Sequence, residues 1–354
     1  MPETPEKPGA SAARVVRSVG GISLRVDGRA VAVTAALGIV ALGMGVLLVG
    51  TGDFPIGAGE VLRTLAGRGD AGQEFIVREL RLPRVLVGLL VGAALGLGGA
   101  LFQSISRNPL GSPDVLGLGQ GAAAGALITI VVLSGDAGQV TVGGLVGGLA
   151  TGAVIYLLSW KRGVHGYRLV LVGIGVSAVV TAVNGYLLTR ADIVDATRAM
   201  VWMTGSLSGR DWDQVWPLLA LCALLVPLVL ANGRGLRMLE MGDDVASALG
   251  VRVERVRLVL MVAAVLLVAG ATAAAGPVAF VALTAPQLAR RLTRSPGPNL
   301  VPSLCMGAAL LVTADWASQR VFGADQLPVG VVTGVLGGGY LLWLLVTERR
   351  AGRI

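Results

Sequence analysis

Apolar stretches of about 20 residues, each nearly free of charged side chains, recur along this chain of 354 residues. An α-helix needs a stretch of this length to cross the hydrocarbon core of a bilayer. Only 14% of the residues are charged, whereas a soluble globular protein carries about 25%. The sequence therefore predicts an all-α polytopic membrane protein with about ten transmembrane helices, at residues 30–50, 84–106, 114–134, 139–159, 168–189, 213–231, 256–275, 278–293, 299–317 and 328–347.

The eighth segment, 278–293, has the weakest apolar pattern because Pro286 and Gln287 interrupt it. Such a broken segment is tolerated where neighbouring helices or a cavity satisfy the backbone. Residues 1–28 are polar, contain proline and show no cleavable signal-peptide pattern, so we expect a disordered tail there. A transmembrane domain then occupies 29–348, and a second short tail occupies 349–354.

Glycines recur at every fourth residue in two of the predicted helices. They are Gly88, Gly92 and Gly96 in the segment 84–106, and Gly117, Gly121 and Gly125 in the segment 114–134. This spacing places each trio on one helix face, where neighbouring backbones can approach closely. Glycine costs roughly 1 kcal/mol in a water-exposed helix, but in a bilayer the backbone hydrogen bonds are obligatory. Both faces are therefore predicted to be packing surfaces.

Positively charged side chains are distributed unevenly between the loops. With the N-terminus placed inside, 20 of the 29 Lys and Arg residues fall in inner segments and 9 in outer segments. This bias places both termini in the cytoplasm. It also explains the net charge of +8 as a topology signal, without any nucleic-acid partner.

Few residues are available for metal, redox or nucleotide chemistry. His165 is the only histidine, and Cys222 and Cys305 both lie in apolar segments, so neither a His-rich metal site nor a disulfide framework is expected. Lys7 and Lys161 are the only lysines, and neither lies in a P-loop motif. The chain is therefore expected to bind no cofactor, and any ATP hydrolysis belongs to another chain.

The longest inner loop, 232–257, contains a short stretch that is compatible with a helix. Asp243 and Asp244 begin it and Gly250 is placed to end it, as expected from capping and the helix dipole. A short helix on the cytoplasmic face could bind a soluble partner. Composition alone favours the alternative, a helix that lies on the membrane surface with no partner.

Motifs with a fixed order run from about residue 30 to 347. They are Arg81-Leu-Pro-Arg84, Gln103, Arg107-Asn-Pro-Leu-Gly-Ser-Pro113, Leu116-Gly117, Gly121-Ala122, Trp202-Met-Thr-Gly-Ser206, Trp212, Gly276-Pro-Val-Ala-Phe-Val-Ala-Leu-Thr-Ala-Pro286, Arg290-Arg291 and Leu327-Pro-Val-Gly-Val-Val-Thr333. Together they resemble the FecCD/BtuC-type ABC importer permeases. The stretch from Ser106 to Asp114 is most similar to FepG-like permeases for ferric enterobactin and related catecholate siderophores.

The resemblance implies a BtuC-like type II importer permease with ten helices in the plasma membrane, in which spans two to five and seven to ten are inverted repeats. It also implies a second, related permease subunit in a heterodimer, two cytoplasmic ATPases that hold ATP and Mg, and an extracytoplasmic siderophore-binding protein. The chain itself would then be a non-catalytic subunit.

The resemblance also assigns roles to individual residues. Arg81 and Arg84 match outer arginines that bind acidic residues of the binding protein, and the alternative for both is anchoring of span two at the membrane interface. A third family arginine aligns with Gln319, beside Arg320. Gln287 stands where the family commonly has histidine.

At the inner face, the resemblance assigns the ATPase coupling helix and a gate. The coupling helix consists of Asp243, Asp244, Val245, Ala246, Ser247, Ala248, Leu249 and Gly250. The turn at Gly166 and Tyr167 matches the inner constriction.

Three polar residues are candidates for the wall of the pathway: Gln103, Asn108 and Asn184. Each is as easily an interhelical hydrogen-bonding residue. The expected cargo is an iron(III)-siderophore complex, with corrinoid or haem as the alternative. A different class of protein, an ion-coupled secondary carrier, would need an ionisable group at mid-membrane depth. Asp315 is the main candidate for that group, and it lies near an outer helix end.

Overall fold

The computed structural model describes residues 14–17, 23–52, 54–114, 116–160, 166–321 and 326–350. Ten helices in this part of the chain correspond to the ten predicted segments: α1 (Gly28–Gly50), α4 (Leu82–Ser106), α5 (Leu118–Leu127), α6 (Ala137–Ser159), α7 (Gly166–Arg190), α9 (Trp212–Ala231), α12 (Val253–Ala275), α13 (Val281–Thr293), α14 (Leu300–Arg320) and α15 (Val329–Arg350). Seven helical segments are long and apolar enough to cross a bilayer, whereas α13 has only 13 residues. The predicted all-α membrane architecture is confirmed.

One short hairpin was not predicted. Within the segment 1–28, for which we expected disorder, the described residues include two strands, β1 (Arg14–Arg17) and β2 (Ser23–Val26), which pair antiparallel. Each strand has only four residues. So short a run carries too little periodic signal to be distinguished from a polar tail.

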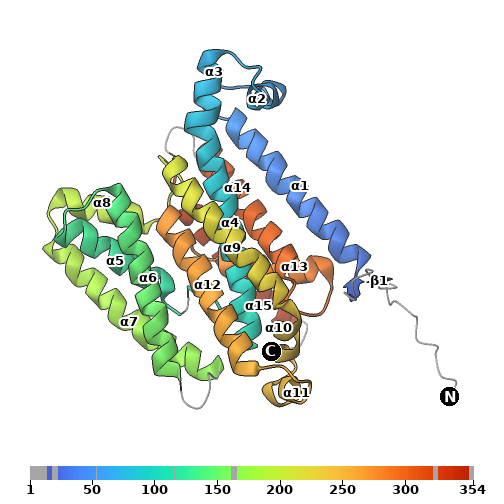
Figure 1. The fold of residues 1–354 in the computed structure, drawn as a ribbon. Helices are drawn as coiled ribbons and strands as arrows, with labels where there is room; N and C mark the ends of the chain where they lie inside the picture. Colours follow the sequence, from blue (N-terminus) through green and yellow to red (C-terminus); the bar gives the residue numbers. More distant parts are fainter. Residues whose placement is uncertain are drawn as a thin grey trace.

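Helix α4 lies in the middle of the bundle. Figure 1 shows α1, α13 and α14 on one side of it, α12 on the other, α9 crossing α4 in the view, and α5, α6, α7 and α8 (Ile193–Met203) grouped at one flank. The helix that contains α4 is 78% buried over its apolar window, against 17% for α7 and 22% for α1. Peripheral helices instead expose large apolar side chains, as expected of surfaces that face lipid.

The two longest loops lie at opposite ends of the bundle. The helices α2 (Ala58–Leu65) and α3 (Ala71–Phe75) are at one end, and α10 (Gly233–Glu240) and α11 (Asp243–Ala248) are at the other, together with the C-terminus (Figure 1). The distribution of Lys and Arg residues predicts that these two loops lie on opposite sides of the membrane. The side of the membrane on which each end lies stays a prediction.

The helical segment that contains α4 begins well before the predicted second span. Span two was predicted to begin at 84, but helix runs without interruption from Ala71 through a π-helical segment, η1 (Ile76–Arg81), into α4. Pro83 explains the π segment. Proline lacks an N–H and its ring crowds the carbonyl four residues earlier, and a π turn widens the helix at that point.

The glycine faces pack as predicted. A Cβ atom at Gly92 or Gly96 would overlap the backbone carbonyl oxygens of Gly307 and Ser303, so α4 lies directly against α14. A Cβ at Gly125 would overlap the carbonyl oxygen of Gly143 in the same way, between α5 and α6.

Gly117 differs from the other glycines of its trio. It precedes α5 with φ +83° and packs against Ser177. Its role is therefore to turn the chain into the helix, and α5 begins four residues later than the predicted span.

The predicted interruption at Pro286 and Gln287 is wrong, since both residues lie inside the continuous helix α13. Two stretches without helix lie elsewhere in the bundle. One follows α4, at 107–114 and 116–117, and the other is 276–280, before α13. They contact each other through the Phe280 N–H, which donates to Asp114 Oδ2 at 3.3 Å. Protein groups therefore satisfy this broken backbone, as the bilayer interior requires.

Candidate functional site

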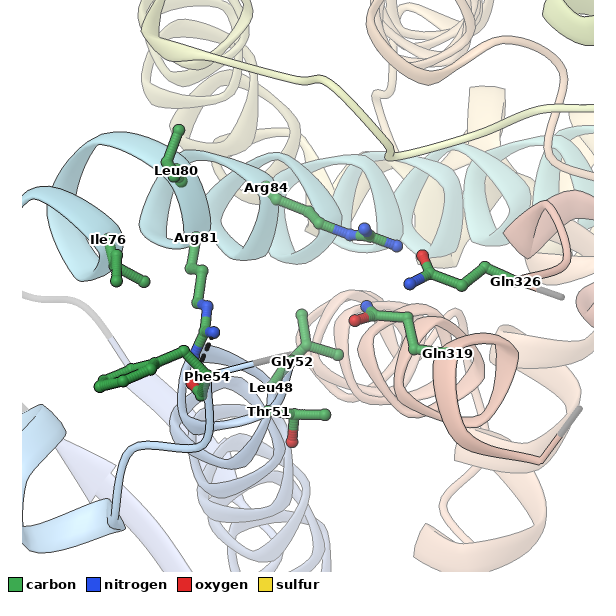
Figure 2. A pocket seen from close by; sticks show the side chains of 10 residues that line it. All are labelled: Leu48, Thr51, Gly52, Phe54, Ile76, Leu80, Arg81, Arg84, Gln319 and Gln326. Atoms are coloured by element: carbon green, nitrogen blue, oxygen red, sulfur yellow. Dashed lines mark hydrogen bonds between the residues drawn. The ribbon is translucent and has the colours of Figure 1, made fainter. Parts of the chain in front are cut away.

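A cavity of about 310 Å³ opens at the end of the bundle that carries α2 and α3 (Figure 2). It lies between the end of α1, the start of α4 and the end of α14. Its lining residues are Leu48, Thr51, Gly52, Phe54, Ile76, Leu80, Arg81, Arg84, Gln319 and Gln326. The cavity thus brings together both predicted docking arginines and the glutamine at the position of the third.

Arg81 donates hydrogen bonds to the end of α1 and to the chain that follows it. Its Nη1 donates to the Val49 carbonyl at 2.9 Å and its Nη2 to the Phe54 carbonyl at 2.7 Å. Gly52 allows this approach, because a Cβ there would lie 2.6 Å from Arg81 Nη2, and its φ of +144° also disfavours other residues. Arg81 therefore positions one wall of the cavity as well as contributing its charge.

Arg84 forms a two-pronged ion pair with Asp315 of α14. Its Nε lies 3.0 Å from Oδ2 and its Nη2 lies 2.7 Å from Oδ1, and Gln319 Nε2 donates to the same carboxylate at 3.1 Å. The Asp315 side chain is 1% exposed and the Arg84 side chain 18%. Arg84 therefore neutralises a buried acid and keeps a partly open face on the cavity, where it points towards Gln319 and Gln326 (Figure 2).

Two guanidinium groups, those of Arg81 and Arg84, line the cavity. Guanidinium groups suit bidentate binding of carboxylates at interfaces. Arg320 is exposed at the last residue of α14 and adds a further positive charge near this end. The docking role of all three arginines stays a prediction.

At the opposite end, the predicted short helix is present as α11, Asp243–Ala248. Gly250 follows it with φ +82°, a conformation that glycine adopts easily at a helix end. Met241, Val245 and Leu249 are 63%, 46% and 58% exposed. Val245 and Leu249, which caps the end of α11, are four residues apart and form a short apolar stripe on one face of the helix. Met241 lies outside α11, before Gly242.

Helix α10, which precedes α11, was not predicted. The chain turns at Asn232 directly from α9 into α10, and Leu236 and Leu239 bury that helix against the bundle. Its amphipathic pattern was visible in the sequence, but eight residues are too few for a firm periodic signal.

The predicted gate turn is only partly described, because 161–165 lie outside the described residues. Helix α7 begins at Gly166, at the same end of the bundle as α11 (Figure 1), and the Tyr167 side chain is 81% exposed. A role at the inner constriction stays a prediction.

Two of the three pathway candidates make hydrogen bonds between helices. Gln103 is 2% exposed, its Nε2 donates to the Leu283 carbonyl at 3.0 Å, and its Oε1 accepts from Gln287 Nε2 at 2.6 Å. Asn184 Nδ2 donates to the Gln120 carbonyl at 3.1 Å. These contacts are the interhelical alternative that the sequence left open, and the pathway role stays a prediction.

The remaining candidate, Asn108, is exposed in the turn after α4, where its Oδ1 accepts from the Leu110 N–H at 2.9 Å. Gln287 Nε2 also reaches this turn, donating to the Pro109 carbonyl at 2.9 Å. Gln287, which the sequence marked as a helix interruption and as a departure from the family, therefore joins α13 to α4 and to the turn that follows α4. Among the described residues, no group of His, Cys, Asp and Glu could hold a metal ion.

Comparisons with known proteins agree with this geometry. The sequence matches the FecCD transport family over residues 38–347. It is 45% identical to the ferric enterobactin transport system permease protein FepG of Escherichia coli (strain K12) over 291 residues, which are 82% of this chain and 88% of that protein. It is 37% identical to the iron(3+)-hydroxamate import system permease protein FhuG of Bacillus subtilis (strain 168) over 296 residues, 81% of this chain and 88% of that protein.

A solved structure of a metal-chelate type ABC transporter in an inward-facing conformation has the same fold. Its TM-score is 0.79 at 26% identity, and the match covers 90% of this chain and 99% of that one. The family match spans nearly the whole chain. The chain therefore belongs to the FecCD transport family and is a membrane-spanning permease subunit of the ABC transporter class.

Proposed function

We propose that this chain is the permease subunit of an ABC importer that takes up an iron(III)-siderophore complex across the cytoplasmic membrane. The observation that carries the proposal is the 45% identity with the ferric enterobactin permease over 82% of the chain. The hydroxamate permease is less similar, at 37%, so the proposed cargo is of the catecholate class.

The two ends of the bundle suit the two kinds of partner that such an importer needs. The cavity with Arg81 and Arg84 would receive acidic side chains of an extracytoplasmic binding protein, and such charges mainly set orientation and association rate. The apolar stripe Val245 and Leu249 of α11, with the exposed Met241 just before the helix, would bind a cytoplasmic ATPase that holds ATP and Mg. Both termini are then cytoplasmic, and a second, related permease completes the heterodimer.

An ion-coupled carrier has less support. That hypothesis depended on Asp315 as a mid-membrane acid, but Asp315 is paired with Arg84 at the end of the bundle. A carboxylate held by a two-pronged ion pair is suited to joining two helices, whereas a proton relay needs a group that exchanges its proton during the cycle.

The proposal is tested by nutrition and by reconstitution. A strain that lacks the chain should fail to grow on a ferric catecholate as its only iron source, and the chain supplied in trans should restore growth. Loss of growth on corrinoid or haem alone would contradict the siderophore cargo. In proteoliposomes, uptake by this chain without an ATPase or ATP would contradict the importer mechanism.

A further inference from the structure

One acidic side chain of α11 contacts two arginines from two different membrane helices. Arg257, in α12, holds both carboxylate oxygens of Asp243: its Nη2 lies 2.7 Å from Oδ1 and 2.8 Å from Oδ2. Arg107, directly after α4, contacts the same Oδ1 through its Nη2. Asp243 therefore joins α11 to α4 and to α12 at once.

The Arg257 side chain is buried, whereas its acidic partners Asp243 and Glu254 are 40% and 49% exposed. The Arg257 side chain is only 5% exposed, and its Nη1 also lies 2.8 Å from Glu254 Oε1. A buried guanidinium requires counter-charges and hydrogen bonds on its N–H groups. Asp243 supplies two of these contacts from outside the helix of Arg257, so the position of α11 is set against α12 by charge.

The Arg107 contact depends on an unusual backbone conformation. Arg107 ends α4 with φ +50° and ψ +32°, the left-handed region, which residues other than glycine seldom adopt. Such conformations persist only when the surrounding structure holds them, and they cluster at functional sites. Here the conformation ends α4 at the point where its last side chain meets α11.

The two faces of α11 are therefore different. Asp243 and the fully buried Ala246 face the bundle, whereas Val245 and Leu249 face outward. A partner that binds the outward stripe would displace α11, and the charged contacts on the inward side would carry that displacement to α4 and α12.

We propose that Asp243 is a positioning residue for energy coupling, which transmits movement of α11 to α4 through Arg107 and to α12 through Arg257. The inference rests on the proposed function, since it assumes that an ATPase binds α11. Coupling of this kind is a free energy between two sites. Its loss should therefore lower the amount of transport per ATP hydrolysed, while the ATPase still binds and still hydrolyses ATP.

The test uses the whole complex of this chain, its second permease and the ATPase in proteoliposomes with loaded binding protein. Asp243→Asn keeps the size of the side chain and removes the charge. We expect uptake per ATP hydrolysed to fall about tenfold, within the range typical of coupling between sites, while hydrolysis continues. Asp243→Glu should restore most of the ratio, because it restores the charge.

Arg255→Gln is the matched control for Arg257→Gln. Arg255 is exposed on the same helix and forms no ion pair in the part of the chain that the structure describes. Its loss removes one positive charge and should leave the ratio unchanged, whereas Arg257→Gln should lower it. Uptake and hydrolysis that fall in parallel in Asp243→Asn would overturn the proposal, because a purely structural role lowers both.

A second measurement needs only the purified chain. Asp243→Asn should increase amide hydrogen exchange at the inner ends of α4 and α12 as well as in α11, and Arg255→Gln should not. Exchange that rises in α11 alone would overturn the connection. If the wild-type complex takes up no ferric chelate, the proposed function fails instead, and the exchange measurement still decides whether Asp243 connects the three helices.

Discussion

The ion pair between Arg84 and Asp315 predicts an asymmetric cost of mutation. Arg84→Met leaves a carboxylate that is 1% exposed with only the Gln319 amide as a side-chain partner. Removing one partner of a buried pair costs about 3–5 kcal/mol, because the other charge stays buried and uncompensated. Asp315→Leu instead leaves Arg84, which is 18% exposed and lines the cavity, in contact with water. We expect that change to cost about 1–2 kcal/mol.

The double variant Arg84→Met with Asp315→Leu completes a double-mutant cycle, which measures the interaction energy between the two side chains. Replacing a buried ion pair by apolar side chains of similar volume is often neutral, because the desolvation of both charges is avoided. The double variant should therefore be no less stable than Arg84→Met alone, and clearly more stable than the sum of the two single changes predicts.

The assay is equilibrium unfolding of the purified chain in mixed detergent micelles, with Arg320→Met as the control. Arg320 lies on the same helix as Asp315 but is exposed, so its loss should cause little change. Equal costs for Arg84→Met and Asp315→Leu, or strict additivity in the double variant, would refute the reasoning that Asp315 depends on Arg84 for its counter-charge.

Three further changes test the packing and the inner surface. Gly96→Leu should lower the thermal midpoint in detergent by the equivalent of about 1–3 kcal/mol or more, because its Cβ would meet the Ser303 carbonyl, whereas Gly43→Leu, at a position with open space, should have no effect. Gln287→Leu should cost about 1–3 kcal/mol in the same assay, because it leaves a buried acceptor without its donor; an unchanged midpoint would mean that this hydrogen bond is dispensable. Leu249→Asp should weaken co-purification of the ATPase at an unchanged midpoint, and intact binding would remove the apolar stripe from the proposed interface.

The helices and their packing faces were predictable because their signals are local. A run of apolar residues long enough to span, or glycines at every fourth position, needs no knowledge of the partner helix. The same holds for α11, where acids at the start and Gly250 after the end are visible within eight residues. The boundaries were less accurate where the backbone departs from ideal geometry, as at the π segment before Pro83.

The contacts that build the site were not predictable in the same way. Arg84 and Asp315 are 231 residues apart, and Gln103 and Gln287 are 184 apart, so no local pattern relates them. The sequence did indicate that Asp315 needs a positively charged partner, since an acid within an apolar span requires one. It could not choose that partner among the arginines. The roles of Arg107 and Arg257 also depend on where α11 lies, which only the folded chain determines.

Two ion pairs, Arg84 with Asp315 and Arg107 with Asp243, lie at the two ends of α4. At one end of α4, Arg84 binds Asp315 of α14, and along its middle Gly92 and Gly96 place its backbone directly against α14. Neither a two-pronged charge pair nor a direct backbone contact can slide without being broken, so α4 and α14 should move together. At one end, both helices contribute residues to the wall of the cavity. Arg107, at the other end of α4, then connects this helix pair to α11. If Asp243 couples α11 to α4 as proposed, a displacement of α11 reaches the cavity through packed helices, and because coupling free energies are reciprocal, we expect a ligand in the cavity to bias α11 to the same extent.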